Sequence, residues 1–296
     1  MLTLDIKNLS PLQIQSYLNH AVAPRPICLA STVDADGNVN LSPFSFFNLF
    51  SVNPPVCVFS PSRRVRDNTT KHTLENIKQV PECVINIVNY DMVQQVSLSS
   101  VEYPLGVNEF VKSGLTELPS QLVKPPRVAE APVQLECVVR EVISLGDTPG
   151  AGNLVIAEVK LIHLNENILN SDGLIDQEKI DLVARLGGDW YARMTGANMF
   201  KVAKPVSSIG IGVDAIPYAI RNSHVLTGNN LGQLGNVEHL PAEEEINTYS
   251  QTDEMKELFD ATIGDSQTRE LQLHLKAKQL LDKGLVMDAW KVLLAD

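Results

Sequence analysis

The order of hydrophobic and polar positions predicts a β-rich chain up to about residue 165. Short segments that are apolar, or that alternate between apolar and polar side chains, are typical of strands when turn residues flank them. Such segments cover residues 27–33, 39–41, 56–60, 83–89, 133–146 and 153–164. The turn residues Asp34-Ala35-Asp36-Gly37-Asn38 join the first two segments and predict a hairpin. The last two segments predict a second, longer hairpin across residues 147–152.

Helical spacing is confined to short stretches in this part of the chain. Ser10-Pro11 supplies an N-cap and a first helical residue, and the apolar spacing predicts a helix that ends before Ala23-Pro24-Arg25-Pro26. A second short helix is predicted over Thr73–Val80, and residues 91–126 alternate between short helical pieces and loops. Repeated β-α-β alternation and a glycine-rich strand-to-helix turn are missing, which disfavours a dinucleotide-binding fold. The pattern favours a small closed or partly open antiparallel barrel.

The last third of the chain has a different character. Residues 205–241 are rich in glycine and show little periodicity, so we expect a long loop that wraps over the surface. Helices are predicted over 243–263 and 266–283, with Gly284 before a last helix that ends at Leu294. The expected organisation is therefore a β domain over 1–204, a glycine-rich wrapping loop over 205–241 and a C-terminal α-helical extension over 242–296. The apolar faces of the helices favour packing on the barrel or on a partner chain over a separate binding module.

The charge balance narrows the range of partners. The chain has 296 residues, of which 44% are hydrophobic, and a formal net charge of −11. An acidic surface repels nucleic acid and anionic membranes, so neither is an expected partner. No apolar run approaches the ~20 residues that span a bilayer, and the first residues lack a basic segment followed by an apolar one. We expect a cytoplasmic protein.

The four cysteines and six histidines give no sign of a metal or disulfide framework. Cys28, Cys57, Cys83 and Cys137 lie far apart, each inside a short apolar run, and no C-x-x-C pair occurs. Such cysteines are usually small buried hydrophobic residues. The histidines show no metal-binding spacing, so no metal site is expected.

One segment opposes the overall charge. Residues 60–73, Ser-Pro-Ser-Arg-Arg-Val-Arg-Asp-Asn-Thr-Thr-Lys-His-Thr, carry four permanent cations and one carboxylate, and they run into a predicted helix start. Guanidinium groups, an ammonium, hydroxyls and a helix N-terminus are the groups that bind a phosphate monoester. The composition fits a solvated basic loop equally well.

A second segment is unusually aromatic. Residues 40–50 hold four of the eight phenylalanines, interleaved with Ser, Asn and Pro. This mixture suits a flat aromatic ligand, although phenylalanines in a strand more often belong to the core. Together with the nearby basic segment, it predicts one ligand with a flat ring at one end and a phosphate at the other.

The order of these motifs resembles a known family. The chain reads P-R-P-I, S-T-V-D-A-D-G-N-V-N, S-P-F-S-F-F-N, N-P-P-V-C-V-F-S and D-N-T-T-K-H-T-L-E-N-I, with V-A-R-L-G-G-D-W-Y at 183–191. This series, within about residues 20–204, is similar to the flavin reductase-like family of FMN-binding split-barrel proteins. The resemblance implies a mainly β fold, a six-stranded Greek-key barrel, and a homodimer with FMN at or near the subunit interface.

The resemblance also assigns residues to the ligand. Ser45, Phe46, Phe47 and Asn48 would line the isoalloxazine, and Ser60 and Ser62 would contact the ribityl chain or the phosphate. Arg64, Lys71, His72 and Thr73 would hold the phosphate. Many relatives read K-D-T where this chain has Lys71-His72-Thr73, so the role of His72 is open. Arg185 would neutralise the phosphate or a reduced flavin, or its stretch serves only as a turn.

The expected function is that of an FMN-dependent oxidoreductase that passes hydride or electrons from NADH or NADPH. The flavin carries this chemistry, which agrees with the lack of an obvious acid, base or nucleophile, and no catalytic residue is assigned. Two alternatives stay open: an electron carrier with a protein partner, and a sensor or adaptor whose helical tail binds a partner. The electron acceptor and the role of the tail are not predicted.

Overall fold

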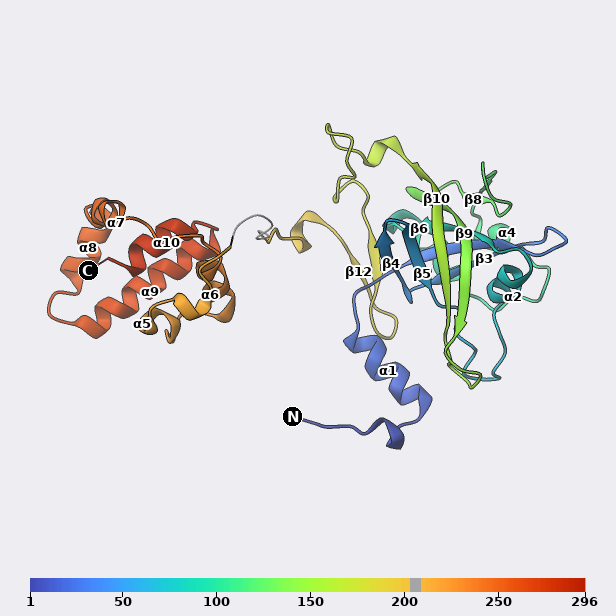
Figure 1. The fold of residues 1–296 in the computed structure, drawn as a ribbon, viewed down its shortest axis with the longest axis horizontal. Coiled ribbons are helices and arrows are strands. Elements are labelled where there is room, and N and C mark those ends of the chain that lie inside the picture. The colour runs from blue at the N-terminus through green and yellow to red at the C-terminus, as the bar shows by residue number, and fades with distance from the viewer. Residues whose placement is uncertain (203–208, 296) are drawn as a thin grey trace. The chain divides into compact units, whose positions relative to one another are not determined.

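The computed structural model describes residues 1–202 and 209–295, and the chain divides into two compact units. Unit 1 is Met1–Phe200 and contains all the strands of the described residues, whereas the described part of unit 2, Lys201–Asp296, is helical (Figure 1). Among the described residues, no helix is both long and apolar enough to cross a membrane.

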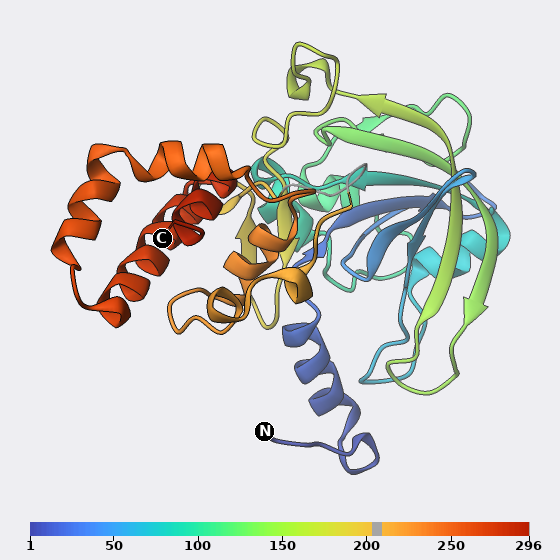
Figure 2. The same ribbon diagram turned by 60° about the vertical axis from the view of Figure 1, so that its left-hand side comes forward.

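Seven strands form the main sheet of unit 1, and every pair of neighbours is antiparallel (Figure 2). In spatial order they are β3 (Val39–Phe44), β2 (Cys28–Val33), β6 (Glu82–Ile87), β9 (Val133–Ser144), β10 (Asn153–Leu164), β5 (Pro55–Phe59) and β4 (Phe47–Val52). The outer strands β3 and β4 follow each other in the chain, separated only by Ser45 and Phe46. The sheet therefore curls until its two edges meet at this corner, and it forms a barrel without a β3–β4 ladder.

This architecture confirms the expected mainly β barrel with short helices and a helical C-terminal region. The main sheet has seven strands and not six, because the chain bends at Ser45–Phe46 and the two halves pair with different neighbours: β3 with β2, and β4 with β5. The expected hairpin turn is also present, since the Asp34 carboxylate accepts from the backbone N–H groups of Asp36 and Asn38.

The barrel interior is filled by alternating side chains of its strands. On β10, Val155, Ala157 and Val159 are buried in this core, and the residues that alternate with them, Leu154, Ile156, Glu158 and Lys160, are more exposed. The rings of Phe44 and Phe59 meet inside it with centroids 5.1 Å apart. All four cysteines are buried and unpaired in the same core, as the sequence predicts.

Smaller elements surround the barrel. The helices of unit 1 are α1 (Pro11–Ala21), α2 (His72–Gln79), α3 (Val93–Leu98) and α4 (Glu109–Ser113), with 3-10 turns at Ile6–Asn8, Tyr90–Met92, Glu166–Ile168 and Gly196–Asn198. A three-stranded sheet has the order β1 (Arg25–Pro26), β11 (Val183–Arg185), β12 (Tyr191–Arg193), and β7 (Glu117–Leu118) pairs with β8 (Arg127–Val128). As predicted, Ser10 caps α1, in a reciprocal arrangement with Gln13.

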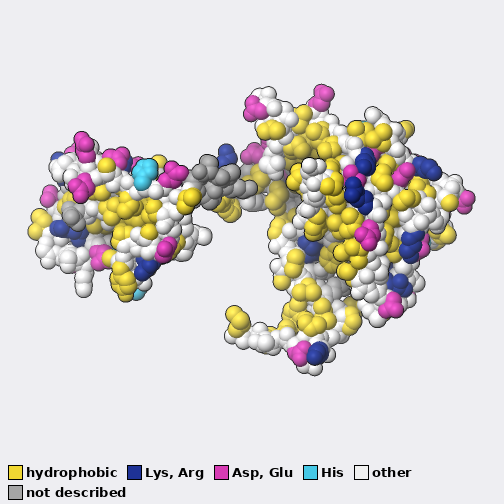
Figure 3. All heavy atoms as spheres, viewed as in Figure 1, with side chains coloured by type: hydrophobic (Ala, Val, Ile, Leu, Met, Phe, Trp, Pro, Cys, Tyr) yellow, Lys and Arg dark blue, Asp and Glu magenta, His cyan; other side chains and the backbone are white. Residues whose placement is uncertain are grey.

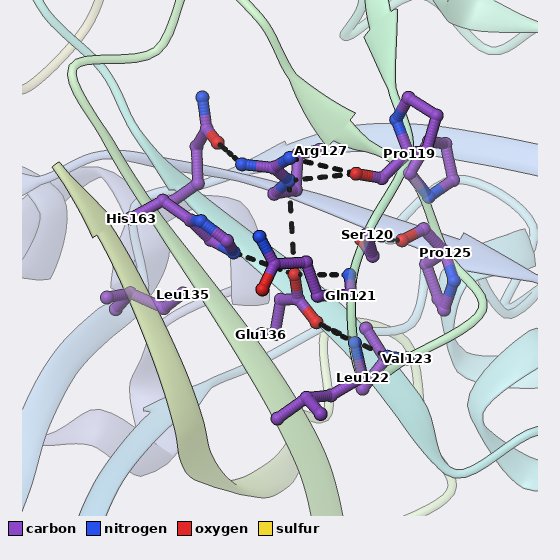
Figure 4. A network of polar contacts seen from close by, with 12 residues as sticks. Pro119, Ser120, Gln121, Leu122, Val123, Pro125, Arg127, Leu135, Glu136 and His163 are labelled. Atoms are coloured by element: carbon purple, nitrogen blue, oxygen red, sulfur yellow. Dashed lines mark hydrogen bonds and ion pairs between the residues drawn. The ribbon is translucent and has the colours of Figure 1, made fainter. Parts of the chain in front are cut away.

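A fully buried carboxylate fixes the 119–126 loop to the barrel (Figure 4). The oxygens of Glu136, on β9, accept from the backbone N–H of Gln121 at 2.8 Å and of Leu122 at 2.6 Å, and one oxygen lies 2.7 Å from His163 Nε2. Burial opposes ionisation, but these N–H donors outweigh it and hold the pKa of Glu136 below its ordinary value.

Unit 2 is built from six helices in the described range. They are α5 (Tyr218–Arg221), α6 (Gly228–Gly235), α7 (Glu243–Ser250), α8 (Asp253–Ala261), α9 (Ser266–Asp282) and α10 (Val286–Leu293), with a 3-10 turn at Val213–Ala215. The predicted helix over 243–263 is two helices, because Thr252 takes an extended ψ of 149° between them. Gly284 follows α9 with φ of 75°, as expected for the residue that ends a helix.

The segment 205–241, which was expected to be a wrapping loop, is where the structure differs most from the prediction. Residues 205–208 lie outside the described range, but 209–241 contain α5 and α6, and Ile216, Ile220 and Leu234 are buried in the core of unit 2. The Trp290 indole donates to the carbonyl of Leu234, which ties α10 to α6. Glycine in this segment permits close packing, since a Cβ at Gly210 would overlap the Gly235 carbonyl oxygen.

Two glycines of unit 2 make a matched pair of substitutions. We expect Gly210→Ala to destabilise unit 2 by about 1–3 kcal/mol, because its Cβ would meet fixed backbone. Gly232→Ala should stabilise it by about 0.5–1 kcal/mol, because Gly232 is an exposed residue of α6 with no atom within 4 Å of an added Cβ. In a Trp190→Phe background, Trp290 is the remaining tryptophan, so its fluorescence during urea unfolding reports on unit 2.

The Glu136 network predicts a pH-dependent stability. Because folding lowers the pKa of this carboxyl, its contribution is present above the unfolded pKa near 4 and is lost as the pH falls through the folded value. We expect Glu136→Gln to lower the free energy of unfolding at pH 7 by about 1–3 kcal/mol, and the difference from wild type to shrink in acid.

The control is Glu141→Gln, an exposed carboxylate on the same strand. Urea unfolding of the three proteins at pH 7 and pH 3 measures both effects. An unchanged stability of Glu136→Gln at pH 7 would contradict the role given to this network.

Candidate functional site

A small polar cavity lies at the N-terminus of α2 in unit 1. Its volume is about 60 Å³, roughly twice the share of one water molecule in liquid water, so it accommodates a terminal group and not a whole nucleotide. Its lining comes from β3, from the basic loop (the part of segment 60–73 that precedes α2), from α2, from the segment after α3, and from α4. The lining residues are Asn40, Ser42, Arg64, Lys71, His72, Thr73, Ser99, Ser100, Val101, Glu102, Tyr103 and Glu109.

The basic loop that forms one wall is held by the β9–β10 hairpin. The backbone N–H of Arg63 donates to the Ala151 carbonyl at 2.8 Å, and Gly150 N–H donates back to the Arg63 carbonyl at 3.2 Å. The side-chain amide of Asn68 donates to the Asp147 carbonyl. These bonds fix the direction in which the following residues leave the loop.

Arg64 enters the cavity with part of its guanidinium unsatisfied. Its Nη1 donates to Thr69 Oγ1 at 2.8 Å and to the Thr70 carbonyl at 2.6 Å. Its Nε is buried and makes no hydrogen bond, although a carboxylate oxygen of Glu102 lies 3.0 Å away. The contact with Glu102 is therefore an ion pair without hydrogen-bond alignment.

Lys71 presents a second cation beside Arg64. Its ammonium lies 5.1 Å from the centroid of the Phe44 ring, and no oxygen within the described ranges accepts a hydrogen bond from it. Burial, followed by the charge of Arg64, lowers the pKa of Lys71. An anion in this cavity would compensate both cations and supply the missing acceptor.

The first turn of α2 adds backbone donors to these cations. Lys71 is the N-cap residue and makes no side-chain capping bond, so the first N–H groups of the helix have no side-chain acceptor from their N-cap. Thr73 is buried, and its hydroxyl accepts from the Asn40 amide at 2.9 Å, which fixes α2 against β3. Helix N-termini with free N–H groups favour anions.

Glu109 adds a second carboxyl group to the lining of the cavity. It is buried on α4 and accepts from the backbone N–H of Leu41 at 2.9 Å. Burial raises the pKa of Glu109, and the Leu41 N–H opposes this shift only partly.

A larger cavity of about 680 Å³ adjoins the polar one. Ser100 lines both cavities. β3 also contributes to both, with Asn40 and Ser42 in the first and Pro43 and Phe44 in the second, where Ser45 follows. The other walls come from α3 and the β11–β12 hairpin: Tyr90, Val93, Gln94, Val96, Ser97, Val183, Arg185, Asp189, Tyr191, Ala192 and Arg193, with Ile27 beside them. A groove of this size, with aromatic walls next to an anion site, suits a flat phosphorylated ligand.

Two arginine–tyrosine pairs shape the wall made by the hairpin. The Arg193 guanidinium lies 3.6 Å from the Tyr90 ring centroid, and its Nε and Nη2 donate to the two oxygens of Asp181, which neutralises its charge. Arg185 lies 4.5 Å from the Tyr191 ring, donates to the Gly188 carbonyl, and has only a 4.0 Å contact with exposed Asp189. Arg185 is therefore the less neutralised of the two cations.

Arg25 holds the elements around this groove together. Its guanidinium donates to the carbonyls of Asn19 and Val22 at the end of α1, to the Leu186 carbonyl, and to Ser45 Oγ at 3.4 Å. Burial, followed by the charge of Arg185, lowers the pKa of Arg25. Arg25 thereby links α1, the β11–β12 hairpin and the corner between β3 and β4.

The structure brings six of the eleven predicted site residues into the two cavities. Four of them, Arg64, Lys71, His72 and Thr73, line the polar cavity. Ser45 and Arg185 line the larger one.

The other five line neither of these cavities. Phe46 is 47% exposed, Phe47 packs on the barrel core, and Asn48 lies on the exposed edge strand β4. Ser60 accepts from the backbone N–H of Asn153, and Ser62 lies beside Gly152, so both adjoin the β9–β10 hairpin. Their assignment to a ligand stays a prediction.

Several lining residues were missed by the sequence analysis. Asn40 and Ser42 flank Leu41 and share one face of β3, but the strand predicted over 39–41 ends before Ser42. Ser99, Ser100 and Glu102 gave no local signal, since only the tertiary fold brings the segment after α3 against the basic loop.

Comparisons with known proteins identify the family of unit 1. The profile of the flavin reductase like domain matches residues 20–180. An uncharacterized protein of Aquifex aeolicus (strain VF5) is 38% identical over 181 residues, which cover 61% of this chain and 90% of that protein. Residues 201–296 lie outside the range that the profile matches.

Two solved structures share the fold of unit 1. Nitrilotriacetate monooxygenase component B from Bacillus cereus has 28% identity and a TM-score of 0.64, over 68% of this chain and 98% of that chain. A structure from Shewanella frigidimarina NCIMB 400, described as a flavin reductase with split barrel domain, has 28% identity and a TM-score of 0.57, over 67% and 96%. The profile covers more than half of the chain, with all seven strands of the barrel, and the chain therefore belongs to the flavin reductase like domain family.

Proposed function

We propose that this protein binds FMN along β3 and acts as an oxidoreductase that takes electrons from NADH or NADPH. The observation that carries the proposal is the pair of adjoining cavities: a small one lined by the cations of Arg64 and Lys71, and a large one with aromatic walls. Family membership supports a flavin, and the size of the small cavity supports a terminal phosphate monoester.

Each end of the ligand would be held by different residues. At the small cavity, the Lys71 ammonium, the free Nε of Arg64 and the first N–H groups of α2 would bind the phosphate. At the large cavity, Phe44 and Ser45 would support the ring, and Arg185 would favour a ligand that gains negative charge there. FMN supplies the hydride and electron transfer when bound, and the chain supplies orientation and electrostatics.

The proposal includes a homodimer. β4 is an outer strand of the main sheet, and Leu49, Phe50 and Val52 on it are 57%, 69% and 82% exposed. Helix α1 has no charged residue among Pro11–Ala21 and buries none of its side chains (Figure 3). Exposed apolar edges of this kind are usually covered by another chain, and we propose that this chain is a second copy of the protein.

The phosphate site predicts a selective loss of affinity. We expect the double variant Arg64→Ala/Lys71→Ala to bind FMN at least 100-fold more weakly than wild type, because each charge-assisted hydrogen bond contributes about 1.5–3 kcal/mol. Riboflavin, which lacks the phosphate, should bind both proteins equally. Quenching of flavin fluorescence during titration measures both affinities.

A matched control removes one arginine and one lysine elsewhere on unit 1. Arg140 lies on β9 in contact with Glu158, and Lys78 lies on α2 in contact with Glu75. Arg140→Ala/Lys78→Ala should bind FMN as wild type does. Normal FMN binding by Arg64→Ala/Lys71→Ala would move the phosphate elsewhere, with Arg185 as the next candidate.

The reductase activity is tested by the absorbance of the FMN-loaded protein under anaerobic conditions. We expect the flavin band near 450 nm, a general property of oxidised flavins, to bleach when NADH or NADPH is added, because hydride transfer reduces the ring. Bleaching by dithionite but by neither nucleotide would contradict the reductase and favour an electron carrier that needs a protein partner.

A further inference from the structure

Glu102 brings a carboxylate into the same cavity as the two cations. One of its oxygens lies 3.0 Å from Arg64 Nε, and the other accepts from Arg66 at 2.8 Å. Glu102 lies in the segment that follows α3, far from the basic loop in sequence, so the fold places it there. Its carboxylate is the negative group closest to the free donor of Arg64.

The ion pair between Glu102 and Arg64 has the features of one that another anion can displace. The Glu102 side chain is 48% exposed, whereas that of Arg64 is 18% exposed, so the carboxylate can move into water while the guanidinium stays in place. The Arg64 Nε donor is not aligned for a hydrogen bond with Glu102. Partly exposed ion pairs of this kind contribute little to stability, because water and salt screen them.

A phosphate monoester in this cavity would be repelled by the carboxylate of Glu102. The monoester carries about 1.5 to 2 negative charges at pH 7, and like charges within a few ångströms repel each other. The monoester offers more charge and more acceptor oxygens to Arg64 and Lys71 than one carboxylate does. Binding therefore favours a state in which Glu102 has left Arg64.

We propose that Glu102 is an internal anion that competes with the ligand's phosphate for Arg64 and so sets the affinity and specificity of this cavity. It partly neutralises the cations in the free protein, and a group of lower charge than a phosphate monoester does not displace it. The inference rests on the proposed phosphate site and assigns to it a residue that opposes binding.

The test compares Glu102→Gln and Glu102→Ala with wild type. Both variants should bind FMN about two- to fivefold more tightly, the factor expected from loss of one competing ion pair. Riboflavin should bind all three proteins equally, because it does not reach the cations. Agreement between the two variants shows that the lost charge, and not a new bond from glutamine, is responsible.

The control is Glu158→Gln, which removes a carboxylate that also contacts two cations, Arg140 and Lys160, on the main sheet. It should leave the FMN affinity unchanged. Unchanged or weaker FMN binding by the Glu102 variants, or tighter binding of riboflavin as well, would overturn the role of Glu102 and leave FMN binding intact.

Inorganic phosphate separates this inference from the proposed function. If no protein binds a flavin, the proposed function fails, but the inference stands when phosphate raises the unfolding temperature of Glu102→Gln more than that of wild type. If phosphate stabilises neither protein or both equally, the inference fails as well. Circular dichroism of each variant establishes that it is folded before binding is measured.

Discussion

The antiparallel pairing of β9 and β10 is the constraint from which the site is built. Their register runs from Asn153 opposite Ser144 to Leu164 opposite Val133, and β6 and β5 pair with its two sides. The turn of this hairpin binds the basic loop through Ala151 and Asp147. A loop with several like charges repels itself in isolation, so these backbone contacts are what direct Arg64 and Lys71 into one cavity.

The same arrangement explains how an acidic chain can present an anion site. A net charge of −11 acts over the whole surface, but its effect is screened beyond about 8 Å in physiological salt. Within the cavity, the nearest charged groups determine the electrostatic potential. They are the cations of Arg64 and Lys71, the exposed carboxylate of Glu102, and the buried carboxyl of Glu109, whose pKa is raised by burial. The local balance can therefore favour a phosphate although the protein as a whole repels polyanions.

Local patterns predicted the parts of the structure that depend on neighbours in sequence. The hairpin turn at 34–38, the cap of α1, and the convergence of Lys71, His72 and Thr73 at a helix start all follow from a few adjacent residues. Arg185 and Ser45 share a cavity because β1 pairs with β11 and Arg25 bridges to the corner after β3, which no local pattern contains. The segment 209–241 was misread because glycine marks both mobile loops and close backbone contacts, and Gly210 against Gly235 is the second kind.

The Lys71 ammonium is partly exposed, lies beside the Phe44 ring and has no hydrogen-bond acceptor among the described residues, which makes an anion a suitable partner for it. Lys71 could have been replaced by an apolar residue beside Phe44 if the position served only to pack the barrel. Burial and the charge of Arg64 lower the pKa of Lys71, so the charged form is less favourable in the cavity than in water. A ligand phosphate would supply the acceptor and the opposite charge that Lys71 lacks, and this interaction would contribute to the free energy of binding. In the free protein, Glu102 partly neutralises the neighbouring Arg64. A partly exposed carboxylate is suited to this role, because it can move into water when an anion of higher charge binds.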